Sequence, residues 1–257
     1  MLIQIPLLSF LLFGACYPLF FWLTAKDPIK HNFHRFHLGC PVFVGGMAVA
    51  GLWLMPVDQS LKNAAALWVL GFLAIAGLFW NKENVRPLAT TLISLWGLKL
   101  FAAVYAVYAK PDILPIAICI FSGLAVSAAF YAMNLGHFYL NVHGLNIAHL
   151  KNAVTALAVI LAIRLIWNIY YLTAGQVLHG GEMIPMGTFI NSLDGFLLWI
   201  AVFFGTVFPL GGLYFAFGTL KLKNTQATTG ILYALLSAIL LGDLAYKYYL
   251  LKFSIPL

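Results

Sequence analysis

The sequence predicts an all-α protein that crosses a membrane about eight times. Hydrophobic residues make up 63% of the chain and charged residues only 8%, a balance that soluble domains of this size do not show. The apolar residues gather in runs of about the 20 residues that a helix needs to span the hydrocarbon core. These runs lack the alternation typical of barrel strands, whereas a helix satisfies its own main-chain hydrogen bonds in lipid. We therefore expect a single bundle of transmembrane helices.

The predicted helices end where charges, prolines or glycines interrupt the apolar runs. They occupy residues 2–24, 38–55, 64–80, 87–108, 113–140, 153–174, 188–218 and 228–250. The first run lacks the basic residues that open a signal peptide, so we expect a retained helix. The sequence Phe-Pro-Leu-Gly-Gly at residues 208–212 predicts a kink in the seventh helix. The alternative is the broken helix of an inverted-repeat transporter, for which the third helix shows no counterpart. The connections are short, except residues 175–187.

Lysines and arginines gather in the connections on one side of the predicted bundle. Eight follow the odd-numbered helices, and three lie on the opposite side. The eight are Lys26, Lys30, Arg35, Lys82, Arg86, Lys151, Lys221 and Lys223, and the three are Lys62, Lys110 and Lys252. Because cytoplasmic loops are rich in these residues, both termini are predicted on the outer side, which is the periplasm if the membrane is the bacterial inner (cytoplasmic) membrane. The net charge of +7 is therefore assigned to topology and not to a nucleic-acid partner.

Five ionisable side chains fall inside the predicted helices: Lys99, Arg164, Asp194, Asp243 and Lys247. A charge in the membrane is costly unless it is paired or hydrated, so we expect an interior polar network. In it, Asp194 and Asp243 would compensate Arg164 and Lys99. Asp243 and Lys247 are four residues apart on one helix face and are also expected to pair. A fixed structural bridge, a proton path and a surface for a polar headgroup all fit this network.

The segment of residues 133–141 holds the densest group of hydrogen-bonding side chains in any predicted span. His137 and Tyr139 are expected at the inner end of the fifth helix, near His37 and Arg35 at the start of the second. Such side chains suit a quinone, because they can hydrogen-bond both of its carbonyl oxygens. The aromatic walls would be Phe33, Phe36 and Phe138. Haem b is a second use of His37 and His137 as axial ligands, ranked lower because four-helix cytochromes usually carry more buried histidines.

Three histidines, His31, His34 and His37, follow one another at every third position. If they are helical, they share one stripe that is a weak candidate for a metal site. No cysteine or acidic ligand accompanies them, and an interfacial connector would have the same pattern. The three cysteines of the chain show no metal-binding or redox spacing, so we interpret them as packing residues.

The chain resembles two families. Residues 33–36, 135–140 and 224–233 are similar to a family of uncharacterised bacterial multi-pass proteins with a Gly-His-aromatic-Tyr-Leu motif, here residues 136–140. The eight-helix layout, residues 37–41 and Gly242-Asp243 followed by Lys247-Tyr248 resemble the NrfD/DmsC type of quinol-interacting membrane anchor. Those anchors typically carry Gly-Glu and Arg at the last place, where this chain has Asp243 and Lys247. The second resemblance implies a haem-free subunit that passes electrons between quinone and an iron–sulfur or cytochrome partner.

These patterns together predict an integral membrane subunit of a respiratory or electron-transfer complex. It would bind quinone and act within an oxidoreductase complex, and not as an enzyme alone, because the sequence offers no redox centre of its own. A transporter of small solutes, ions or protons that uses the charged network is the first alternative. A structural or assembly factor, in which every charge is a fixed bridge, is another.

Overall fold

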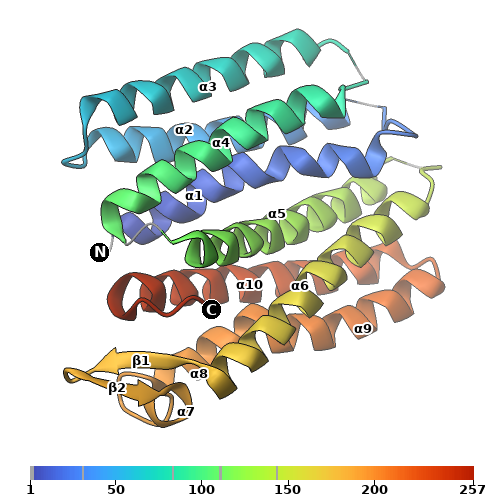
Figure 1. Cartoon of the computed structure of the whole chain (residues 1–257). Coiled ribbons are helices and arrows are strands. Elements are labelled where there is room, and N and C mark those ends of the chain that lie inside the picture. Colours follow the sequence, from blue (N-terminus) through green and yellow to red (C-terminus); the bar gives the residue numbers. More distant parts are fainter. Residues whose placement is uncertain (1–2, 31, 83, 110–111, 143) are drawn as a thin grey trace.

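The computed structural model describes residues 3–30, 32–82, 84–109, 112–142 and 144–257. Within these ranges, eight helical spans are long and apolar enough to cross a membrane, which confirms an all-α polytopic bundle (Figure 1). The N and C ends of the chain lie at the same end of the bundle, which we call the terminal end. The opposite end carries the connections with Lys26, Lys82 and Lys223, and we call it the lysine-rich end.

The first five spans are single helices, except that a 3₁₀ segment continues the first. They are α1 (Gln4–Cys16) with η1 (Tyr17–Thr24), α2 (Phe33–Trp53), α3 (Gln59–Phe79), α4 (Pro87–Tyr108) and α5 (Ile113–Asn141). The last three are α6 (Ala148–Ala174), a composite of α8 (Phe196–Val202), the π turn η2 (Phe203–Val207) and α9 (Phe208–Lys221), and α10 (Thr225–Phe253). Between α6 and α8, an antiparallel hairpin of β1 (Gln176–His179) and β2 (Glu182–Pro185) leads into the single turn α7 (Met186–Phe189).

Some helix ends differ from the predicted ones. In two places polar residues before an apolar run already belong to the helix, and in one place part of a predicted helix is not helical. The second helix begins at Phe33 and not at residue 38, and the third at Gln59 and not at residue 64. The predicted helix 188–218 is interrupted, because residues 190–195 leave the helix. There the Ser192 hydroxyl accepts a hydrogen bond from the Gly195 N–H at 3.1 Å, a local turn that competes with helical bonding.

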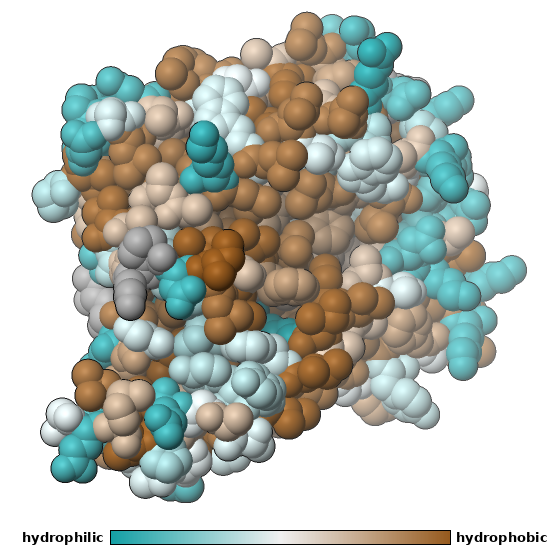
Figure 2. All heavy atoms as spheres, in the orientation of Figure 1, coloured by the Kyte–Doolittle hydropathy of each residue, from teal (hydrophilic) through white to brown (hydrophobic). Residues whose placement is uncertain are grey.

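The surface fits contact with a lipid bilayer. In Figure 2, brown, hydrophobic residues cover the middle of the visible face, and hydrophilic residues lie toward both ends of the bundle. Many exposed side chains along the spans are large and apolar, as at Leu95, Ile166 and Phe215, and Lys99 is a charged exception. Because lipid tails are themselves apolar, such side chains need no protein cover in a membrane.

One half of the bundle packs around a tryptophan of α3. Trp68 is fully buried, and its indole N–H donates to the main-chain oxygen of Ile93 in α4 at 3.0 Å. Glycines of three other helices make room for the ring: a Cβ added at Gly45 or Gly97 would lie within 3 Å of the indole. At Gly14 the same atom would also press on the backbone of α2. Small residues thus let α1, α2 and α4 close around α3.

The other half of the bundle is built on α5 and α10, which lie side by side at its centre (Figure 1). The Asn224 side chain caps α10 by accepting from the Ala227 N–H at 3.0 Å, and asparagine is a preferred residue at this position. Further along, Gly242 of α10 touches Gly205 of the π turn so closely that a Cβ on Gly242 would overlap the Gly205 backbone. These contacts set the register in which α10 presents its polar residues to α1, α5 and α6.

The π turn η2 stands directly before the segment in which the sequence predicts a kink. Pro209 has no N–H to donate to the carbonyl four residues earlier, so the helical ladder is already incomplete there. A π turn is one way for a helix to absorb such an interruption. It turns Thr206 into the interior, where this side chain is fully buried.

Candidate functional site

A buried ion pair within α10 is the centre of the candidate site. Lys247 Nζ donates to Asp243 Oδ1, and both side chains are at most 3% exposed. The predicted pairing across one helical turn is therefore present. Asp243 lies ten residues before the end of α10, or about 15 Å along the helix axis, so the pair is well below the terminal end.

Two serine hydroxyls from other helices complete the surroundings of the Asp243 carboxylate. Ser122 of α5 donates to Oδ1, and Ser9 of α1 donates to Oδ2 at 2.9 Å. A buried charge is tolerated when it is paired and hydrogen-bonded, and this carboxylate receives donors at both oxygens. Three helices thus converge on one acidic group.

An apolar crevice of about 270 Å³ runs from the bilayer-facing surface to Asp243. Its mouth is formed by the exposed side chains Phe10, Leu240 and Leu244, and its inner end holds Ser9 and Asp243. Phe13, Cys40, Val126 and Phe130 contribute to the walls. The crevice lies just below the ~300–1,000 Å³ range of small-molecule sites, and it combines apolar walls with few polar groups in the way such sites do.

A second, much smaller cavity lies on the opposite side of the ion pair. Pro115, Cys119 and Ser122 of α5 line it together with Lys247 and Leu257. Its volume of about 10 Å³ is close to that of one water probe, the least that a bound water needs. The Asp243–Lys247 pair therefore separates the crevice from a small cavity on the side of the terminal end.

Arg164 of α6 is buried beside this centre but is not paired with an aspartate. Its guanidinium carbon lies 4.0 Å from the centre of the Tyr246 ring, and Nη2 donates to the main-chain oxygen of Leu257 at 3.1 Å. Asn168, one turn further on, donates to Thr206 Oγ1 at 3.1 Å and to the Tyr246 hydroxyl at 2.7 Å. This polar layer joins α6, the π turn and α10. It places the Arg164 guanidinium on the ring of Tyr246, the residue before Lys247.

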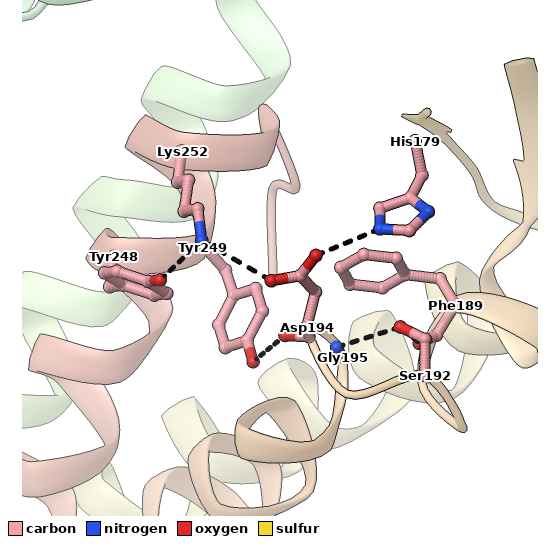
Figure 3. Close-up of polar contacts among 8 residues, drawn as sticks. All are labelled: His179, Phe189, Ser192, Asp194, Gly195, Tyr248, Tyr249 and Lys252. Carbon is pink, nitrogen blue, oxygen red and sulfur yellow. Dashed lines mark hydrogen bonds and ion pairs between the residues drawn. The ribbon is translucent and has the colours of Figure 1, made fainter. Parts of the chain in front are cut away.

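Asp194 lies outside the spans, where it fastens the β-hairpin to α10 (Figure 3). Its Oδ2 is 3.1 Å from His179 Nε2 of β1, and its Oδ1 is 3.6 Å from Lys252 Nζ. The Tyr249 hydroxyl donates to the main-chain oxygen of Asp194 at 2.7 Å. The hydrogen bond from His179, followed by the charge of Lys252, holds the pKa of the Asp194 carboxyl below its ordinary value of 3.8. The acid expected to compensate Arg164 thus serves as a surface latch.

Lys99 is the one predicted network member that lies on the outside of a span. It is exposed near the middle of α4, and within the described residues no carboxylate contacts its ammonium group. The five predicted network residues therefore occupy four places: the buried pair, the Arg164 layer, the Asp194 latch and the exposed Lys99.

The four quinone candidates from the sequence lie on two helix ends that meet, although their side chains have other partners. The start of α2 and the end of α5 meet, since the rings of Phe33 and Phe138 are 5.1 Å apart. The predicted polar side chains do not bond to one another within the described residues. His137 is exposed and Tyr139 donates to the main-chain oxygen of Asn146. Arg35 donates to the main-chain oxygen of Trp80 at 2.9 Å and so closes the end of α3.

His37 is enclosed by an aromatic cluster. Its ring is stacked on Phe33 with 3.8 Å between centroids, and its Nδ1 lies 2.6 Å from the Tyr17 hydroxyl. Tyr131 approaches from α5 with a centroid distance of 5.0 Å. The side chain is only 2% exposed, so an axial haem ligand at this position requires the cluster to open. These surroundings therefore do not fit haem as they stand.

The weak metal candidates have other partners where the structure describes them. His31 lies outside the described residues, and His34 and His37 are both buried in the first turns of α2. His34 Nε2 lies 2.9 Å from the main-chain oxygen of Trp80. The described ranges contain no group of three or more His, Cys, Asp or Glu side chains that could hold a metal ion.

The serine partners of Asp243 were not predicted. Ser9 and Ser122 are single hydroxyls in apolar runs, and most such hydroxyls bond only to the preceding turn of their own helix. The polar pairing of Asn168 with Thr206 and Tyr246 had a weak signal, because Asn168 follows Arg164 by one turn on the same helix face.

Comparison with family models, with curated proteins and with solved structures gives no match to this chain.

Proposed function

We propose that this chain is an integral membrane subunit that binds quinone or quinol in the crevice ending at Asp243. The observation that carries the proposal is the course of this crevice, which leads from exposed apolar side chains to a buried, hydrogen-bonded carboxylate. A quinone reaches its site from within the bilayer, so its binding pocket needs an apolar opening toward lipid. The inner end needs a group that exchanges protons and hydrogen bonds with the ring oxygens.

The residues of the crevice have matching roles in this proposal. The ring would lie against the wall that Phe13 and Phe130 form together, since these two rings touch edge to face with 5.2 Å between their centroids. Asp243 would accept a hydrogen bond, and during oxidation a proton, from a quinol hydroxyl. Lys247 is paired with the carboxylate and neutralises its charge. A proton gained by Asp243 would therefore change the net charge of the pair from zero to +1. Ser9 is the hydroxyl at the crevice that can bond either ring oxygen or Asp243.

Electrons would pass between this quinone and an iron–sulfur or cytochrome centre of a partner subunit in a respiratory complex. The proposed setting is the bacterial inner membrane, with the lysine-rich end in the cytoplasm. The terminal end, with the β-hairpin, then faces the periplasm. The small cavity beside Lys247 lies on this side and offers a place for a water between the pair and the surface.

The test is photolabelling of the full chain in lipid nanodiscs with an azido-quinone, followed by mass spectrometry of the labelled peptides. We expect label on residues that line the crevice, and at least tenfold weaker binding in Asp243→Asn. Val126→Phe fills the crevice without touching the ion pair, so it should abolish labelling while unfolding is unchanged.

His137→Ala is the matched control, because His137 is exposed near the other candidate surface. Its binding should equal that of the wild type. Label at the end of α5 that is lost in His137→Ala would refute the crevice and favour the surface predicted around Tyr139. Labelling that neither variant weakens would refute quinone binding at both places.

A proton carrier is the second candidate, favoured by the position of the ion pair between two cavities. Such a carrier would move protons across liposomes that contain the purified chain and no quinone. A pH-sensitive dye inside the liposomes measures this flux under an applied membrane potential. Flux that Asp243→Asn removes supports the carrier, and its absence together with quinone labelling supports the electron-transfer subunit.

A further inference from the structure

Lys99 presents a charge to the lipid near the middle of the membrane. It lies nine residues from the end of α4 at Tyr108 and twelve from its start at Pro87, about 14 and 18 Å along the axis. Half of a typical hydrocarbon core is about 15 Å. The Lys99 backbone is therefore close to mid-depth by either measure.

The side chain of Lys99 cannot easily reach the headgroups. Side chains on a helix tilt toward its N-terminus, which for α4 is the more distant end. A lysine that extends in this direction still ends deep in the hydrocarbon. Anionic headgroups are thus poor partners for this ammonium group.

Within the described residues, no other helix covers the face of α4 that carries Lys99, apart from its edge at Trp96, which lies against Gly71 of α3. The opposite face of α4 is packed inside the bundle, where Gly97 fits against Trp68 and Ala15. The face of Lys99 is exposed along the helix, and it is formed by Leu88, Leu92, Leu95, Trp96, Ala103 and Ala106. These residues are apolar, and two small alanines follow the lysine on this face. Small residues let the backbone of another helix approach closely in a membrane.

A second copy of the chain does not supply the missing charge. Two Lys99 faces placed against each other would bring like charges together. The acids of the described residues lie outside the spans, except Asp243, which is buried with Lys247. No described carboxylate is therefore exposed to lipid at the depth of Lys99.

We propose that the Lys99 face of α4 docks a transmembrane helix of a different protein that carries an aspartate or glutamate at mid-depth. An intramembrane lysine is expensive in lipid and is stabilised by a carboxylate of a neighbouring helix. The partner acid removes this cost only in the assembled complex, so the pair also selects the partner and its depth. This inference does not depend on quinone binding. It adds to the proposed function the chemistry by which the subunit recognises its partner.

The test uses synthetic leucine-rich transmembrane peptides and the full chain in phosphatidylcholine vesicles, with energy transfer between fluorescent labels as the readout. One peptide carries a central aspartate, and matched peptides carry leucine or lysine there. We expect the aspartate peptide to bind the wild type at least tenfold more tightly than the leucine peptide. Lys99→Leu should remove this preference, and Lys99→Glu should transfer it to the lysine peptide.

Lys223→Leu is the control, since Lys223 is an exposed lysine outside the spans. It should leave the preference for the aspartate peptide unchanged. Equal binding of the aspartate and leucine peptides, or a preference that persists in Lys99→Leu, overturns the proposal. Loss of the preference when phosphatidylglycerol is added to the vesicles also overturns it, in favour of an anionic lipid.

A photoreactive amino acid at Ala103 tests the same face in native membranes. The expected product is a crosslink to a transmembrane segment of another protein with an acidic residue near its centre. Crosslinks to a second copy of the chain, or to segments without such a residue, refute the proposal. No step of these experiments involves quinone, so their failure is distinguishable from failure of the quinone site.

Discussion

Replacing Lys247 by methionine should strongly destabilise the bundle, because it leaves the Asp243 charge buried without its cation. Both side chains are at most 3% exposed, and breaking a buried ion pair on one side costs about 3–5 kcal/mol. The hydrogen bonds from Ser9 and Ser122 remain and favour the lower end of this range. The double variant Asp243→Asn, Lys247→Met removes both charges and keeps an acceptor for the serines. It should recover about 2 kcal/mol or more of the loss, since neutral replacements of buried pairs are often neutral or stabilising.

The free energy of unfolding can be measured by titration with dodecyl sulfate in mixed micelles, with circular dichroism as the readout. Lys99→Met is the matched control, because Lys99 is also an intramembrane lysine but lies on the exposed face of α4. In the isolated chain its replacement should not destabilise. If Lys247→Met unfolds like the wild type, or if the double variant is as unstable as Lys247→Met, Lys247 does not stabilise the bundle by compensating the Asp243 charge.

Gly242→Ala should destabilise by about 1–3 kcal/mol in the micelle titration, because its Cβ overlaps the backbone of the π turn, whereas Gly46→Ala, in open space, should not; equal effects would contradict the packing. The lowered pKa of Asp194 means that its latch contributes stability above its ordinary value of 3.8 and loses it as pH falls through the lowered pKa. The protection factors of the β-hairpin amides, which correct the exchange rates for the intrinsic effect of pH, should therefore fall in this acid range, and Asp194→Asn should abolish this fall. An impermeant maleimide should label a cysteine at Glu182 in intact cells and one at Lys223 only after permeabilisation; the reverse would invert the proposed orientation.

Hydropathy was sufficient to predict the spans but not the ends of the helices. It measures how apolar a segment is and not whether its backbone is helical, so the turn around Ser192 was included in a predicted helix. The start of α2 was missed for the converse reason, since His34 and His37 are polar and yet buried in the helix.

The candidate site was predictable where the chemistry is local. Asp243 and Lys247 pair across one turn of α10, so their spacing was enough. The serines of α1 and α5 come from distant parts of the chain, and their partners depend on how helices pack. No pattern within a single helix carries that information.

The sequence around Lys99 indicates that this residue faces lipid, although its charge suggests an interior position. Ser94 and Gly97 lie on the buried side of α4, while Leu92, Leu95 and Trp96 are exposed. In membranes, small residues mark the packed side of a helix and large apolar residues face lipid. Attention to side-chain size, and not to charge alone, predicts that this lysine points out of the bundle.

The π turn between α8 and α9 also bears on how the chain tolerates changes in length. Because a π turn holds an extra residue relative to α-helical geometry, deleting one residue from Phe203–Val207 allows a regular helix to form. The residues beyond it would keep the faces that they present, because the extra residue is taken up within the π turn itself. Thr206 would lose its buried position, while α8 would stay in place. A deletion of one residue here is therefore tolerated by α9, and sequences that share this fold can differ in length by one residue at this point without a change in the residues that α9 presents to its neighbours.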